Sequence, residues 1–159
     1  MLELQLFQRE WIFKEDFKSI DEAFTIMAKR FVQADLVKNS YEESIKQRER
    51  EYPTGIDLSV VGADLPNIAI PHTEREHCKT TKVVLVKLDQ AISVGNMMSS
   101  SQELKNVRYL FMILNSTDRE QTGILSKIME LVSKADNIKA LEEAESVENL
   151  YEVVNGYTF

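Results

Sequence analysis

One short segment of the chain gathers the side chains best suited to covalent chemistry. Residues 67–78 (NIAIPHTEREHC) hold both histidines, His72 and His77, together with the only cysteine, and Pro71 directly precedes His72. A neutral imidazole near pH 7 can attack with one ring nitrogen while a hydrogen bond holds the other nitrogen in place. The group that such a histidine would carry best is phosphate, so the segment is a candidate phosphoryl-transfer site.

Other roles for these residues fit less well or stay open. His72 and His77 are five residues apart, so on a helix they would point about 140° apart, unlike the i, i+4 pair of zinc-binding helices. No G-x-S-x-G segment supports a Ser-His-Asp hydrolase. The histidines could also be surface or capping residues without chemistry, which is the ordinary role of histidine. We expect Cys78 to be a small buried residue.

The residues around His72 predict how it is positioned. Residues 67–70 (NIAI) are typical of a buried strand, and Pro71 restricts the backbone where that strand ends. Thr73 to Glu76 has the T-x-x-E form of a helix start, which would bring free N–H groups suited to an anion. We therefore expect His72 at the end of a strand, where open α/β sheets place their ligand sites.

Apolar periodicity predicts the remaining elements. One face of a helix at 16–37 carries apolar side chains at steps of three and four, namely Phe17, Ile20, Phe24, Met27 and Phe31. Ser40 and Glu43 are spaced as a capping box, and Ser146 is a candidate N-cap. Strands are predicted at 2–13, 67–70, 82–88 and 107–114, and helices at 16–37, 40–51, 118–134 and 146–156. This order favours a layered α/β sandwich over a barrel or a bundle.

Composition narrows the class of protein. The 159 residues are 43% hydrophobic and 28% charged, which is typical of a folded domain, and we expect one domain over residues 1–159. The net charge of −7, without a basic tract, argues against nucleic acid or an anionic membrane as main partner. One cysteine, no leader pattern and no long apolar run predict a cytoplasmic protein.

Two motifs in order resemble a known family. The run REREYPTGI at 48–56, followed by NIAIPHTEREH at 67–77, resembles the EIIA components of the bacterial sugar phosphotransferase system. The likeness is to the fructose–mannitol-type superfamily and especially to its galactitol-type branch. Members show an arginine–glutamate pair before a proline–threonine–glycine turn, then a strand end that carries the phosphorylated histidine. The resemblance covers nearly the whole chain and implies the mixed-sheet α/β sandwich of mannitol-type EIIA.

The resemblance implies a phosphoryl relay without a cofactor or a metal. Phosphate would pass from the phosphocarrier HPr to His72 and on to a cognate EIIB, with the membrane component EIIC as an indirect partner, for uptake of galactitol or a related sugar. Arg48 matches the arginine near the phosphorylated histidine. Mannitol-type members have a second histidine where this chain has Gln121, and galactitol-type members have glutamine there. His77 matches a histidine of the galactitol branch, but an exposed histidine on a short helix is an equal alternative.

A relay also needs a surface that two partners can share. Candidates around the histidine are Ile70, Met97 and Met98, with residues 93–102 (SVGNMMSSSQ) expected to form a mobile loop. The methionines could equally fill the core. Two further functions remain as alternatives: a regulatory, nitrogen-type EIIA-like domain whose phosphorylation state is the signal, or a non-catalytic α/β binding module.

Overall fold

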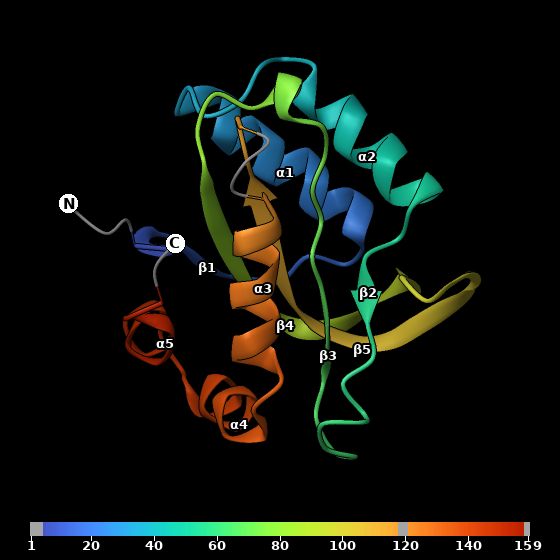
Figure 1. The fold of residues 1–159 in the computed structure, drawn as a ribbon, viewed down its shortest axis with the longest axis vertical. Coiled ribbons are helices and arrows are strands. Elements are labelled where there is room, and N and C mark those ends of the chain that lie inside the picture. The colour runs from blue at the N-terminus through green and yellow to red at the C-terminus, as the bar shows by residue number, and fades with distance from the viewer. Residues whose placement is uncertain (1–4, 118–120, 158–159) are drawn as a thin grey trace.

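The computed structural model of the protein describes residues 5–117 and 121–157. Within these residues a mixed five-stranded sheet lies between two layers of helices (Figure 1). The strands are β1 (Phe7–Glu15), β2 (Gly55–Ile56), β3 (Asn67–Ala69), β4 (Lys82–Asn96) and β5 (Ser99–Leu114). The helices are α1 (Ile20–Gln33), α2 (Tyr41–Glu51), α3 (Gln121–Val132), α4 (Ala135–Glu143) and α5 (Val147–Val154). The predicted α/β sandwich with a mixed sheet is confirmed.

The long hairpin of β4 and β5 organises the sheet. β4 pairs parallel with β1 and antiparallel with β5, and β5 also pairs parallel with β3. The short strand β2 runs antiparallel to β3 and pairs with the far end of β4, where Gly55 lies opposite Asn96. In Figure 1 the yellow hairpin accordingly extends to the side of the molecule on which β2 lies. The sheet therefore curls until the hairpin tip meets the segment that enters β2.

Both faces of the central strands are buried. Val83 and Leu85 of β4 face a core shared with α3, α4 and α5, whereas Val84 and Val86 face a second core under α1 and α2. A strand covered on both sides has an uninterrupted apolar sequence instead of an alternating one. This explains why the run at 82–88 was recognisable as a strand.

Helix α1 carries the predicted apolar face. Phe24, Met27 and Phe31 are buried against the sheet. Phe17 is buried as well, but it precedes the helix, which begins after Ser19 because the Ser19 side chain accepts a hydrogen bond from the N–H of Glu22. The predicted start at residue 16 was therefore too early.

Helix α2 begins differently from the prediction. The Ser40 side chain makes no capping hydrogen bond, so the predicted capping box with Glu43 is wrong. The Ser40 hydroxyl lies 2.7 Å from Nδ1 of His77 instead. The Ser40 hydroxyl thus bonds a residue distant in sequence instead of capping its own helix.

The opposite face holds α3, α4 and α5. Helix α4 was not predicted as a separate element, since the sequence interpretation had only two helices in this region. For α5 the predicted N-cap is confirmed, because the Ser146 side chain accepts from the N–H of Asn149.

Among residues 5–117 and 121–157, no helix has the length and apolar character to cross a bilayer.

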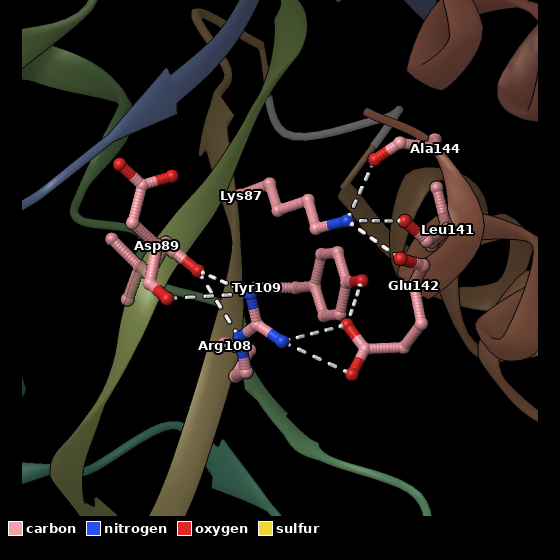
Figure 2. Close-up of polar contacts among 8 residues, drawn as sticks. Lys87, Asp89, Arg108, Tyr109, Leu141, Glu142 and Ala144 are labelled. Carbon is pink, nitrogen blue, oxygen red and sulfur yellow. Dashed lines mark hydrogen bonds and ion pairs between the residues drawn. The ribbon is translucent and has the colours of Figure 1, made fainter. Parts of the chain in front are cut away.

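A buried lysine anchors the end of α4 to the sheet. Lys87 of β4 donates to the backbone oxygens of Leu141, Glu142 and Ala144 at 2.7, 3.1 and 2.8 Å (Figure 2). These carbonyls lie at the C-terminal end of α4, where a positive charge is favourable. Two residues of β5 complete the cluster: Tyr109 donates to the Glu142 carboxylate at 2.5 Å, and Arg108 pairs with the same carboxylate.

Residues 93–102 are not the mobile loop that the sequence predicted. They form the end of the hairpin, with β4 running to Asn96, a turn at Met97 and Met98, and β5 starting at Ser99. Backbone pairing between the two strands continues to the tip, where Asn96 lies opposite Ser99. Such pairing does not depend on apolar side chains, so the serine-rich sequence concealed it.

Candidate functional site

His72 lies just beyond β3, at the edge of the sheet predicted for a ligand site. It forms a parallel bridge with Ile113, next to the last residue of β5, and the carbonyl of Pro71 accepts from the N–H of Ile113 at 3.0 Å. Because β3 and β5 are parallel, their carboxyl ends lie at the same edge. The predicted position of His72 after a strand is confirmed.

The imidazole of His72 is held in one tautomer. Its Nδ1 lies 2.8 Å from the backbone oxygen of Ile70. A carbonyl can only accept, so Nδ1 carries the proton and Nε2 keeps its lone pair. Nε2 is therefore the ring atom available to attack phosphorus.

The surroundings of His72 also keep the ring neutral. Burial lowers its pKa below the ordinary 6.5, and the nearby charge of Arg48 lowers it further. The hydrogen bond to Ile70 and the carboxylate of Glu74 oppose this effect without reversing it. A neutral imidazole is a nucleophile at pH 7, whereas an imidazolium is not.

Arg48 extends from the last turn of α2 toward the same region. Its guanidinium carbon lies 4.5 Å from the centre of the Tyr52 ring, and its Nη1 is 3.4 Å from the Glu74 carboxylate. The guanidinium thus stacks on the Tyr52 ring and pairs with Glu74 through Nη1, which leaves its other N–H groups to bind an anion. Arginine in this geometry can offer two donors to one phosphate.

His72 and Arg48 line a common cavity of about 500 Å³. The hairpin tip forms another wall, with the Met97 and Met98 side chains 42% and 90% exposed. Among the described residues that line it, Arg48 supplies the positive charge and Glu51 a negative one. The lining residues are Arg48, Glu51, Tyr52, Pro53, Thr54, His72, Met97 and Met98.

His77 lies in a neighbouring hollow instead. It ends a short 3-10 helix, η1 (Arg75–His77), and its Nδ1 is bonded to the Ser40 hydroxyl. This second hollow, of about 360 Å³, shares Arg48 and Glu51 with the cavity of His72. The structure thus brings Arg48 and His72 together and keeps His77 in the adjoining space.

Several local predictions near the site need correction. Thr73 does not start a regular helix: its hydroxyl bonds the Glu74 carboxylate and the Ser44 hydroxyl, and only η1 follows. The expected anion site at a helix N-terminus is therefore missing from this segment. Ile70 is 0% exposed and cannot belong to a docking patch, because it packs into the core. Gln121 begins α3, but its side chain lies outside the described residues.

Cys78 behaves as the sequence predicted. Its side chain is 6% exposed, and burial raises the pKa of its thiol. A protonated thiol in the core is a poor nucleophile.

The sequence analysis did not predict that the glutamate of the arginine–glutamate pair is buried. Glu49 of α2 is 7% exposed and accepts from both the N–H and the hydroxyl of Thr54. The spacing of Tyr41, Ile45 and Glu49 could have indicated this burial, because they are four residues apart and form the buried stripe of an otherwise polar helix.

Comparison with known proteins places the chain in a family. The family model described as phosphoenolpyruvate-dependent sugar phosphotransferase system, EIIA 2, matches residues 5–157. The chain belongs to this EIIA 2 family. Its members are phosphoryl carriers of the sugar phosphotransferase system. Among curated protein sequences, none matches the chain.

Solved structures of EIIA proteins share the fold. IIA mannitol from Escherichia coli is 19% identical, with a TM-score of 0.72 over 93% of this chain and 98% of that chain. A complex of IIA mannitol with phosphorylated IIB mannitol from Escherichia coli gives 19% identity and a TM-score of 0.73, over 95% and 98%. The nitrogen regulatory protein IIA-Ntr from Neisseria meningitidis is 16% identical, with a TM-score of 0.64 over 94% and 96%. At these identities the likeness concerns the EIIA fold alone.

Proposed function

We propose that this EIIA domain accepts a phosphoryl group from phosphorylated HPr on Nε2 of His72 and passes it to a cognate EIIB. The observation that carries the proposal is the neutral His72 imidazole, whose Nδ1–H is held by Ile70 and which lines a cavity together with Arg48. This arrangement meets the main demands of phosphoryl transfer, which are positioning and charge stabilisation.

The transfer step follows from the tautomer. As Nε2 attacks, the phosphorus–nitrogen bond of the donor breaks, and its electron pair returns to the donor ring. The proton stays on Nδ1, so the product ring is a phosphorylated imidazolium whose N–H donates to the Ile70 carbonyl. The positive ring makes Nε2 a better leaving group when the acceptor of EIIB attacks the phosphorus. After onward transfer His72 is neutral again.

Arg48 is the residue that meets the charge of the moving phosphoryl group. Its guanidinium lies at the cavity between Tyr52 and Glu74, with N–H groups left for phosphoryl oxygens. Glu51 and Glu74 oppose a bound dianion, so this site favours passage of phosphate over storage. That balance suits a relay.

The hairpin tip is the surface that partners would contact. Met97 and Met98 line the cavity of His72 and also an apolar groove of about 530 Å³ that includes Val60, Leu125 and Met129. Exposed flexible methionines adapt to more than one partner, as a protein that binds both HPr and EIIB requires.

Labelling with phosphate tests the proposal. The chain is incubated with HPr, enzyme I and labelled phosphoenolpyruvate, and acid-labile, base-stable label is measured on three proteins. We expect label on the parent and on His77→Ala, which serves as the matched histidine control, and none on folded His72→Ala. Label retained by His72→Ala, or an unlabelled parent, would refute the assignment.

For the biological role, we propose uptake of galactitol or a related sugar by a domain working in the cytoplasm. The support is the galactitol-type motif pair, with glutamine at position 121 and histidine at position 77. Transfer from the phosphorylated chain to a galactitol-type EIIB, and genes for EIIB and EIIC beside its own, would favour transport. Label that reaches no EIIB would favour the regulatory alternative.

A further inference from the structure

A buried carboxylate lies behind the wall of the His72 cavity. Glu49 occupies the third position of the buried stripe of α2, after Tyr41 and Ile45, and is 7% exposed. An apolar residue would be the ordinary occupant of such a position, since burying a carboxyl group is unfavourable unless hydrogen bonds compensate. The presence of glutamate there calls for a specific role.

Both carboxylate oxygens are used, and both contacts go to one residue. The N–H of Thr54 donates to Oε2 at 2.8 Å, and the Thr54 hydroxyl donates to Oε1 at 2.5 Å. Thr54 is itself 3% exposed, so water cannot replace either bond. Glu49 therefore fixes the backbone and the side chain of Thr54 together.

Thr54 is joined to His72 by two more hydrogen bonds. Its carbonyl accepts from the N–H of Ile70 at 3.2 Å, and the Ile70 carbonyl accepts from Nδ1 of His72 at 2.8 Å. A continuous path thus runs from the Glu49 carboxylate through Thr54 and Ile70 to the imidazole. Thr54 and Ile70 are each held by one contact at the N–H and another at the carbonyl oxygen, so the peptide groups on both sides of each residue are fixed.

The turn at Pro53, Thr54 and Gly55 also contacts the hairpin tip, which forms the opposite wall of the cavity. Gly55 accepts from the N–H of Met97 at 2.8 Å, and a side chain at Gly55 would come within 2.5 Å of the Gly95 carbonyl oxygen. A side chain at Gly95 would come within 2.6 Å of Pro53. The turn and the hairpin tip are therefore in backbone contact, and a shift of Thr54 would displace both walls.

We propose that Glu49 is a positioning residue that, through Thr54 and Ile70, holds His72 in the Nδ1–H tautomer and keeps Nε2 aimed into the cavity. The inference rests on the proposed function, because it concerns the phosphorylated histidine. It differs from a purely structural role in predicting a change at the imidazole in a protein that stays folded. An isosteric amide can replace the carboxyl group, since its oxygen accepts from the Thr54 N–H and its NH₂ donates to the hydroxyl.

Nuclear magnetic resonance of ¹⁵N-labelled histidine rings provides the main test. The chain has two histidines, so His77→Ala leaves one signal set and assigns His72. The tautomer ratio of His72 is measured across pH for the parent, Glu49→Ala, Glu49→Gln and Thr54→Val. Glu42→Ala is the matched control, because it removes a carboxylate of the same helix that pairs with Lys46. Phosphoryl uptake from phosphorylated HPr is measured on the same samples.

We expect the Nδ1–H tautomer to predominate in the parent, in Glu49→Gln and in Glu42→Ala, with uptake rates within about twofold. Glu49→Ala should move toward the Nε2–H tautomer that a solvent-exposed histidine side chain prefers and take up phosphate about tenfold to a hundredfold more slowly. A folded Glu49→Ala protein with the parent tautomer ratio and uptake rate would overturn the proposal.

Thr54→Val decides the question if Glu49→Ala does not fold. It removes the hydroxyl contact, keeps the backbone bond and preserves volume, so we expect a partial tautomer shift and slower uptake. Parent values of both in Thr54→Val would then refute the role of Glu49. The tautomer measurement needs no phosphoryl donor. An unlabelled parent would therefore defeat the proposed function alone, and the ring spectra would still test Glu49.

Discussion

The pH dependence of stability in Glu49→Gln follows from the burial of this carboxyl group. Burial raises the pKa of Glu49 from 4.5 to about 7, although the two hydrogen bonds from Thr54 oppose the shift. Between these values the folded protein keeps a proton that the unfolded chain has released. Glu49 by itself therefore makes the free energy of unfolding of the parent fall as pH rises from about 4.5 to about 7.

The magnitude follows from the width of this window. Each pH unit between 4.5 and about 7 is worth about 1.4 kcal/mol, so the titration of Glu49 lowers the unfolding free energy of the parent by about 3 kcal/mol. Glutamine does not titrate and can keep both contacts to Thr54. The difference in unfolding free energy, Glu49→Gln minus parent, should rise by about 3 kcal/mol between about pH 4 and pH 8.

Urea denaturation of both proteins across this pH range measures the difference. His72 contributes with the opposite sign, because its lowered pKa makes stability rise with pH up to about 6.5. That contribution is common to both proteins and cancels when they are subtracted. A difference that stays constant within about 1 kcal/mol would show that Glu49 has the same pKa in the folded and the unfolded protein and that the reasoning from burial is wrong.

Four further changes test other parts of the molecule. Arg48→Lys should slow single-turnover transfer from phosphorylated HPr about tenfold because it loses the planar pair of donors, whereas exposed Arg50→Lys should match the parent; equal rates would make Arg48 a surface charge. His77→Ala should accept phosphate but pass it to EIIB more slowly, since the hollow that holds His77 also includes Arg48; an unchanged rate of transfer to EIIB would leave His77 without a role in the relay. Lys87→Met should lower the unfolding free energy in urea by about 2–4 kcal/mol, because three helix-end carbonyls lose their donor, and an unchanged midpoint would contradict this. Met98→Gln should weaken EIIB binding about tenfold in a calorimetric titration while leaving urea stability unchanged, because the side chain is 90% exposed.

Features that depend on near neighbours could be predicted from the sequence. The apolar spacing of Phe24, Met27 and Phe31 predicts the buried face of α1, and the uninterrupted run at 82–88 predicts a strand buried on both sides. The motif around His72 predicts a histidine at the carboxyl end of a strand, because Pro71 and the preceding apolar residues act within a few residues of it.

Tertiary structure decided where hydrogen-bonding groups found partners distant in sequence. Ser40 and Thr73 have local capping patterns, yet their hydroxyls bond His77 and Ser44, because folding brought those groups closer than the backbone N–H groups of their own segments. The partner of Glu49 has the same origin: the spacing from Tyr41 and Ile45 places Glu49 on the buried stripe of α2, but only folding brings Thr54 to it. Local patterns specify which face of an element is apolar. Which polar side chain meets which partner depends on contacts that exist only after the layers have packed.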